Sequence, residues 1–181
     1  MEALSLISAA ALALMAPVPA VQAQDAAPAD AAPAPEAVTM NYQQWTLRCI
    51  NAEDGKRCEI NQFVILRNEE NDTSQRLMRV SFGRNAEGAE TLLLVLPLGT
   101  NLSKGVTFNV SEVMTLEDLD FSFCLSDGCR IPYPVNSGLL AEMRAGGQGN
   151  VTVFFLNAPN AVALPVDFTG FNEAYAAFLA E

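Results

Sequence analysis

The sequence predicts a mainly β protein, an antiparallel β-sandwich or partly open barrel with two short helices, one of them C-terminal. Between residues 43 and 166, apolar and polar residues alternate with a period of two more often than they follow a helical period, as is typical of strands buried on one face. Turn residues separate these segments at near-regular spacing. Because 50% of the residues are apolar and 17% are charged, the chain can bury a sizeable core.

The predicted strands differ in how many of their faces are apolar. Residues 91–96 are apolar on both faces, which is typical of a central strand. In residues 118–123, Leu119, Phe121 and Phe123 are predicted to share one face. Pro165 should lie at a strand edge or end because it donates no backbone hydrogen bond. In chain order, the strands are residues 45–49, 58–64, 76–82, 91–96, 105–110, 118–123, 150–156 and 161–166.

Two segments follow a helical pattern instead. Residues 137–144 come after a possible cap at Asn136 or Ser137 and stop before Gly146-Gly147, which predicts a short helix. Near the C-terminus, apolar residues recur at i, i+4, i+7 and i+8, the stripe of an amphipathic helix that lies on the sheet. A face that docks a partner is the alternative. The stripe consists of Phe171, Tyr175, Phe178 and Leu179.

The N-terminal region resembles an export signal followed by a spacer. Residues 3–16 are apolar but shorter than the roughly 20 residues of a spanning helix, and Val21-Gln22-Ala23 fits a cleavage site, although no basic residue precedes the apolar run. Residues 24–38 consist mainly of Ala, Pro and acidic residues, as in a disordered tether. We predict a signal peptide over 1–23, a tether over 24–40 and one disulfide-containing β domain over 41–181. The mature protein is expected in the periplasm or secreted, without stable membrane insertion.

The four cysteines are predicted to form two disulfides, because an even number in an exported chain indicates a disulfide framework. Three pairings are possible, and the local one is preferred: Cys49 with Cys58 across a hairpin, and Cys124 with Cys129 across a turn at Ser126-Asp127-Gly128. The first pair is too widely spaced for a zinc site, and no C-x-x-C redox motif occurs.

The charge balance argues against nucleic acid as a partner. The chain has 10 basic and 21 acidic residues, a net charge of −11, and its two lysines are Lys56 and Lys104. Phosphate backbones and anionic lipid head groups are therefore expected to be poor partners. The acidity is interpreted as a contribution to solubility, and a basic partner is the alternative.

Catalytic, cofactor and metal sites are not predicted. The chain contains no histidine, so a Ser or Cys nucleophile lacks its usual base. Ser103-Lys104 offers a Ser–Lys pair, but adjacent strand residues face opposite sides. Among the acids, carboxylate pairs for glycoside hydrolysis and a calcium site at Glu117-Asp118-x-Asp120 are both possible but lack supporting motifs. The acids considered are Glu112, Glu117, Asp118 and Asp120.

A set of landmarks over about residues 42–180 resembles the invasion-associated locus B family. In order, they are Trp45-x3-Cys49, Arg57-Cys58-x3-Gln62, Leu96-Pro-Leu-Gly99, Phe123-Cys124-x3-Gly128-Cys129 and Gly170-Phe171. The resemblance implies an exported protein of Gram-negative, mostly alphaproteobacterial, origin, linked in some pathogens to invasion of host cells. The family supplies no catalytic residues to carry over, and only the four cysteines map as functional positions.

These observations predict a non-catalytic envelope or secreted protein that binds an unknown protein or envelope partner. Two alternatives stay open: a hydrolase of unfamiliar type with a Ser–Lys or carboxylate pair, and a structural envelope-stress protein. A convergent polar pocket at Lys104 or at residues 117–120 would favour the hydrolase. The sequence leaves the oligomeric state undetermined.

Overall fold

The computed structural model describes residues 37–52 and 55–181. The predicted signal peptide and the predicted tether as far as residue 36 lie outside these residues. Residues 37–40, predicted from the sequence to be part of the tether, instead belong to the first strand, β1 (Ala37–Tyr42). The β domain therefore includes residues before position 41.

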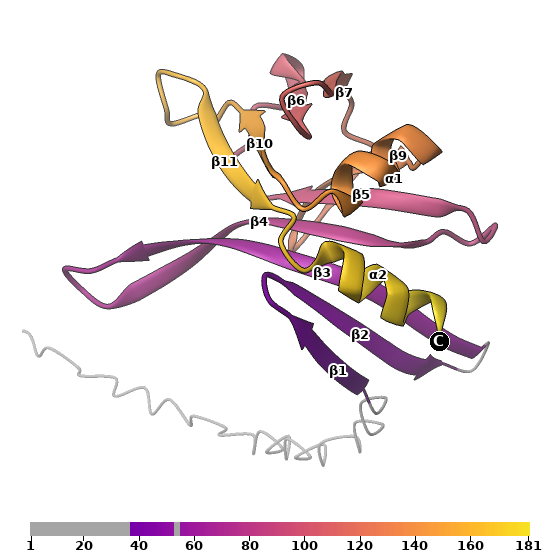
Figure 1. The fold of residues 1–181 in the computed structure, drawn as a ribbon. Helices are drawn as coiled ribbons and strands as arrows, with labels where there is room; N and C mark the ends of the chain where they lie inside the picture. Colours follow the sequence, from indigo (N-terminus) through magenta and orange to yellow (C-terminus); the bar gives the residue numbers. More distant parts are fainter. Residues whose placement is uncertain (1–36, 53–54) are drawn as a thin grey trace, which may run out of the picture. The chain divides into compact units, whose positions relative to one another are not determined.

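In the described residues, the larger of two antiparallel sheets has seven strands in the order β1-β2-β3-β4-β5-β9-β8. Figure 1 shows β1 to β5 following one another across this sheet. The predicted central strand, β5, does lie inside this sheet, between β4 and β9. Besides β1, the strands are β2 (Trp45–Ala52), β3 (Gly55–Asn68), β4 (Thr73–Arg84), β5 (Glu90–Leu96), β8 (Phe123–Leu125) and β9 (Gly128–Pro134).

The second sheet has four strands in the order β11-β10-β6-β7. Pro165 lies in β11 at the edge of this sheet, as predicted from its missing N–H. The strands are β6 (Val106–Asn109), β7 (Thr115–Leu119), β10 (Gln148–Val153) and β11 (Val162–Asp167), and a single 3-10 turn, η1 (Leu102–Lys104), precedes β6. The fold class predicted from the period-two pattern is confirmed, as two sheets that do not close into a barrel.

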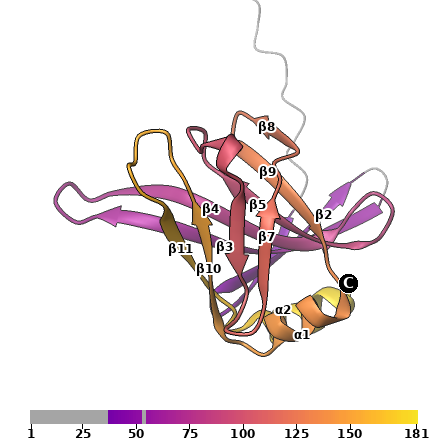
Figure 2. The same ribbon diagram turned by 90° about the horizontal axis from the view of Figure 1, so that it is seen from above.

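Both predicted helices form, and they lie side by side (Figure 2). Helix α1 (Ser137–Arg144) begins at the predicted cap, where Asn136 Oδ1 accepts a hydrogen bond from the backbone N–H of Leu139 at 2.9 Å. Helix α2 (Phe171–Leu179) contacts β1, β2 and β3. In the part of the chain that the structure describes, neither helix has the length and apolar character needed to cross a membrane.

An aromatic cluster joins α2 to the inner face of the larger sheet. The ring of Trp45 lies 5.0 Å from that of Phe171, and the ring of Phe82 meets Tyr175 and Phe178 edge-on at 5.4 and 5.5 Å. All five side chains are buried. Three residues of the predicted stripe, Phe171, Tyr175 and Phe178, therefore pack into the core. Leu179, the fourth, does not: it is 53% exposed at the end of α2.

The predicted strand 118–123 is wrong, because the two sheets divide it. β7 ends at Leu119 in the smaller sheet, and β8 begins at Phe123 in the larger one. Asp118 has a φ of 51°, a left-handed conformation that interrupts an extended strand. Leu119 is buried, whereas Phe123 is 52% exposed, so they do not share a face.

Candidate binding cleft on the outer face of the larger sheet

The alternation that fills the core also places a second set of side chains on the opposite, outer face of the larger sheet. On β2, Trp45 and Leu47 are buried, and Arg48 and Ile50 therefore point to the outer face. Arg48 is directly opposite Glu59 on β3, and Ile50 is opposite Arg57. Both pairs thus share the outer face.

The strand register extends this face across the sheet. Ser81 on β4 is opposite Leu93 on β5, and Leu93 is opposite Pro132 on β9. Arg130, two residues from Pro132, is opposite Phe123 on β8. These side chains line one cleft of about 490 Å³ that runs from β2 to β8.

The floor of the cleft is mainly apolar. Ile50 and Leu93 are half-buried in it. Ser81 and Asn61 are buried polar groups, and the Ser81 hydroxyl donates to Asn61 Oδ1 at 2.6 Å. A Cβ atom at Gly83 would lie 3.4 Å from the carbonyl oxygen of Cys58, an ordinary contact distance. A side chain at Gly83 would therefore pack against β3 at ordinary contact distance and occupy part of the cleft.

Positive charge is concentrated in the lining. Its four arginines are Arg48, Arg57, Arg84 and Arg130, and its one acidic residue is Glu59. The whole chain has 10 basic residues and a net charge of −11. The local balance is therefore opposite in sign to that of the whole chain.

The arginine nearest β8 is held in a defined position. The Arg130 guanidinium donates to both carboxylate oxygens of Asp127 at 3.0 Å and lies 5.5 Å from the ring centroid of Phe123. This hydrogen bond lowers the pKa of the Asp127 carboxyl below its ordinary value of 3.8. The paired charges hold the Arg130 guanidinium beside Phe123.

The disulfide Cys124–Cys129 positions Phe123 beside the cleft. It joins directly opposed residues of β8 and β9. Gly128, the first residue of β9, has a φ of 139°, and a Cβ atom there would clash with the Leu96 carbonyl oxygen. Only glycine fits so close to the neighbouring strand.

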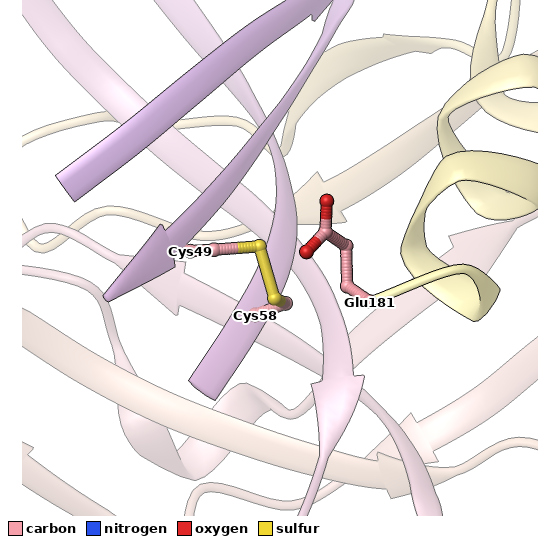
Figure 3. A group of neighbouring side chains, drawn as sticks. All are labelled: Cys49, Cys58 and Glu181. Carbon is pink, nitrogen blue, oxygen red and sulfur yellow. A yellow bond between two sulfur atoms is a disulfide. The ribbon is translucent and has the colours of Figure 1, made fainter. Parts of the chain in front are cut away.

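The second disulfide, Cys49–Cys58, joins opposed residues of β2 and β3. The structure thus contains the two local disulfides that the sequence predicts. Glu181 lies beside this pair (Figure 3). Its carboxylate forms a salt bridge with Lys56. Although Cys49, Cys58 and Glu181 are close together, the two sulfurs are bonded to each other and are not available as thiolate ligands.

The residues considered for catalysis lie away from the cleft. Ser103 and Lys104 are exposed in η1, where the Ser103 hydroxyl donates to Asn101 Oδ1 at 2.8 Å. The Ser103 hydroxyl therefore donates its hydrogen bond to an Asn side chain and not to the amine of Lys104, as a Ser–Lys pair would require. The four acids Glu112, Glu117, Asp118 and Asp120 are exposed. Within residues 37–52 and 55–181, the acids at 117–120 form no cluster with the spacing of a metal site.

Comparison with known proteins agrees with the landmarks of the sequence. The family model described as invasion associated locus B (IalB) protein matches residues 45–179. This chain belongs to the IalB family. An invasion protein B homolog of Brucella abortus (strain 2308) is 29% identical over 135 residues, covering 74% of each chain. Invasion protein B of Bartonella bacilliformis is 26% identical over 139 residues, covering 76% of this chain and 72% of that protein.

The fold of this IalB-family chain is also similar to a solved structure. The crystal structure of invasion associated protein B from Bartonella henselae matches with a TM-score of 0.65 and 25% identity, covering 79% of this chain and 95% of the other. These relatives are named as invasion proteins rather than as enzymes.

Proposed function

We propose that this IalB-family protein is exported and acts by binding, not by catalysis, through the outer face of its larger sheet. The observation that carries the proposal is the arginine-lined cleft, which runs from β2 to β8 on that face. Concave sites with an apolar lining and a few charged groups are typical of ligand binding.

Export is supported by the two disulfides and by the N-terminal sequence. Disulfides form and persist in oxidising compartments such as the periplasm and the cell exterior. Residues 3–16 have the apolar character of a signal-peptide core. We therefore place the mature protein in the periplasm or outside the cell.

The names of the relatives narrow the kind of partner. Relatives in Bartonella and Brucella are named invasion protein B or a homolog of it. A component of the host-cell surface or of the bacterial envelope is the kind of partner that this name suggests for the present chain. Because the cleft is lined by four arginines and one acid, we expect that partner to present anionic groups.

The proposal can be tested with charge-reversal variants of the mature protein. Immobilised wild type, Arg48→Glu and Arg67→Glu are incubated with periplasmic and outer-membrane extracts, and retained components are identified. Arg48 lines the cleft, whereas Arg67 is an exposed residue of β3 outside it, which makes Arg67→Glu the matched control. We expect a component that wild type and Arg67→Glu retain and Arg48→Glu loses.

Equal retention by all three proteins would show that the outer face is not the binding surface. Export is checked separately by fractionating cells that produce the full chain and alkylating free thiols. Recovery of the protein in the cytoplasm with four reactive cysteines would contradict the proposal.

A further inference from the structure

The net charge of the chain predicts that anionic head groups are poor partners, but the cleft is a local exception. Arg48 and Arg57 lie on neighbouring strands on the same face, as diagonal neighbours in the β2–β3 pair. Both line the cleft and both are exposed. A guanidinium group presents several N–H donors in a planar fork that matches a carboxylate. Glu59, the one acidic residue of the lining, is directly opposite Arg48. With two basic groups and one acidic group, this end of the cleft still has the chemistry to bind an anionic head group.

The rest of the cleft suits an apolar chain. From the arginine pair, the lining continues over Leu93 to Pro132 and Phe123. Phe123 is 52% exposed although it is aromatic. An apolar ligand that covered Leu93 and Phe123 would remove both from water, which stabilises the complex in proportion to the buried area. The volume of about 490 Å³ lies in the range of roughly 300–1,000 Å³ that is usual for small-molecule sites.

The backbone of the floor argues against an extended peptide as the occupant. β3, β4 and β5 each have a paired strand on both sides, so their N–H and C=O groups are already committed along the paired segments. A peptide that adds to a sheet needs an open strand edge. The floor of this cleft offers side chains instead.

We propose that the cleft binds a free single-chain amphiphile with a carboxylate head group, the chemistry of a long-chain fatty acid. The head group lies between Arg48 and Arg57, and the alkyl chain lies over Leu93 towards Phe123. This inference rests on the proposed binding function and names the ligand class for the same cleft.

The direct test is calorimetric titration of the oxidised mature protein with dodecanoate below its micelle concentration. We expect saturable binding of one molecule per chain. Arg48→Gln should weaken it about tenfold or more, because a hydrogen bond to a charged group is lost. Dodecanol, which lacks the charge, should bind at least tenfold more weakly than dodecanoate, and dodecyltrimethylammonium should not bind.

A second variant fills the cleft without removing a charge. A Cβ atom at Gly83 would make only ordinary contacts with β3, the shortest 3.4 Å, and the φ of Gly83 is not in the positive range, so we expect Gly83→Val to fold and to block the alkyl chain. Arg67→Gln is the control and should bind dodecanoate like wild type. Thermal melts of all variants verify that each is folded.

Several outcomes would overturn the inference. Equal affinity for dodecanoate and dodecanol would remove the role of the arginines, and unchanged binding by Gly83→Val would place the ligand elsewhere. Sedimentation with phosphatidylglycerol vesicles in the absence of dodecanoate binding would assign the face to a membrane surface. If dodecanoate fails to bind but Arg48→Glu still loses the envelope component, the ligand class is wrong and the binding function stands.

Discussion

Trp45 and Arg48 lie three residues apart on β2 and serve opposite faces of the sheet. Trp45 is 0% exposed, and its indole N–H donates to the backbone oxygen of Asp167 at 2.9 Å, joining the larger sheet to β11 of the smaller one. Arg48 lines the cleft on the other side. One strand thus supplies both the core contact between the sheets and a charged group of the site.

Replacing Trp45 with Ala should lower the free energy of unfolding by about 3–5 kcal/mol, because the change leaves a cavity among packed aromatic rings. Chemical denaturation followed by far-UV circular dichroism measures this difference. Phe123→Ala, at an exposed position, is the aromatic control and should cost much less. A near-zero cost at Trp45 would contradict its place in the core.

The arginine cleft could not be predicted from the sequence, although its parts were visible there. Arg48, Arg57, Arg84 and Arg130 come from four different strands. They meet only through strand pairing, which a single sequence does not specify. The period-two pattern does indicate which residues lie on the outer face of each strand. Arg48, for example, alternates with buried residues of β2 and so faces away from the core.

At the scale of elements, the sequence predicts correctly those whose signals are local and misses those that depend on tertiary contacts. The cap at Asn136 and the stripe of α2 involve residues close in sequence, so both helices were found. β9 was missed because it contains Pro132 and Pro134, residues that argue against a central strand. They are tolerated because β8 pairs with β9 only as far as Arg130, which leaves that edge open beyond it.

The two disulfide-bonded hairpins should differ in their effect. Cys49–Cys58 closes a longer loop, with a sequence separation of 9 against 5 for Cys124–Cys129, and a longer loop stabilises more, although both should contribute less than the ~3 kcal/mol of a 15-residue loop. Thermal melts should show a larger loss of midpoint for the double variant Cys49→Ala/Cys58→Ala than for Cys124→Ala/Cys129→Ala. Reductant should lower the midpoint of wild type, and equal midpoints with and without it would refute a stabilising role.

At the scale of the whole domain, the chain alternates between the sheets. It forms β1–β5 in the larger sheet, β6 and β7 in the smaller, β8 and β9 in the larger, and β10 and β11 in the smaller again. α2, which comes last, then packs on β1, β2 and β3. No single cut of the described chain separates the two sheets.

This interleaving predicts that both sheets unfold as one cooperative unit. Amide hydrogen exchange in mild denaturant should give the same free energy of opening for the centre of β4 and the centre of β10. Exchange of β10 through a separate opening of lower free energy would show that the smaller sheet unfolds independently.

Because β9 comes late in the sequence, the edge of β5 that it covers stays unpaired while the intervening chain is synthesised. β5 is rich in leucine, and its partner β9 begins only at Gly128, after β6, β7 and β8. Until then, a leucine-rich strand has an unpaired edge, the type of surface that recruits other nascent chains into aggregates. The hairpin that carries Cys124 and Cys129 covers this edge, so prompt formation of its disulfide would protect the newly made protein from self-association.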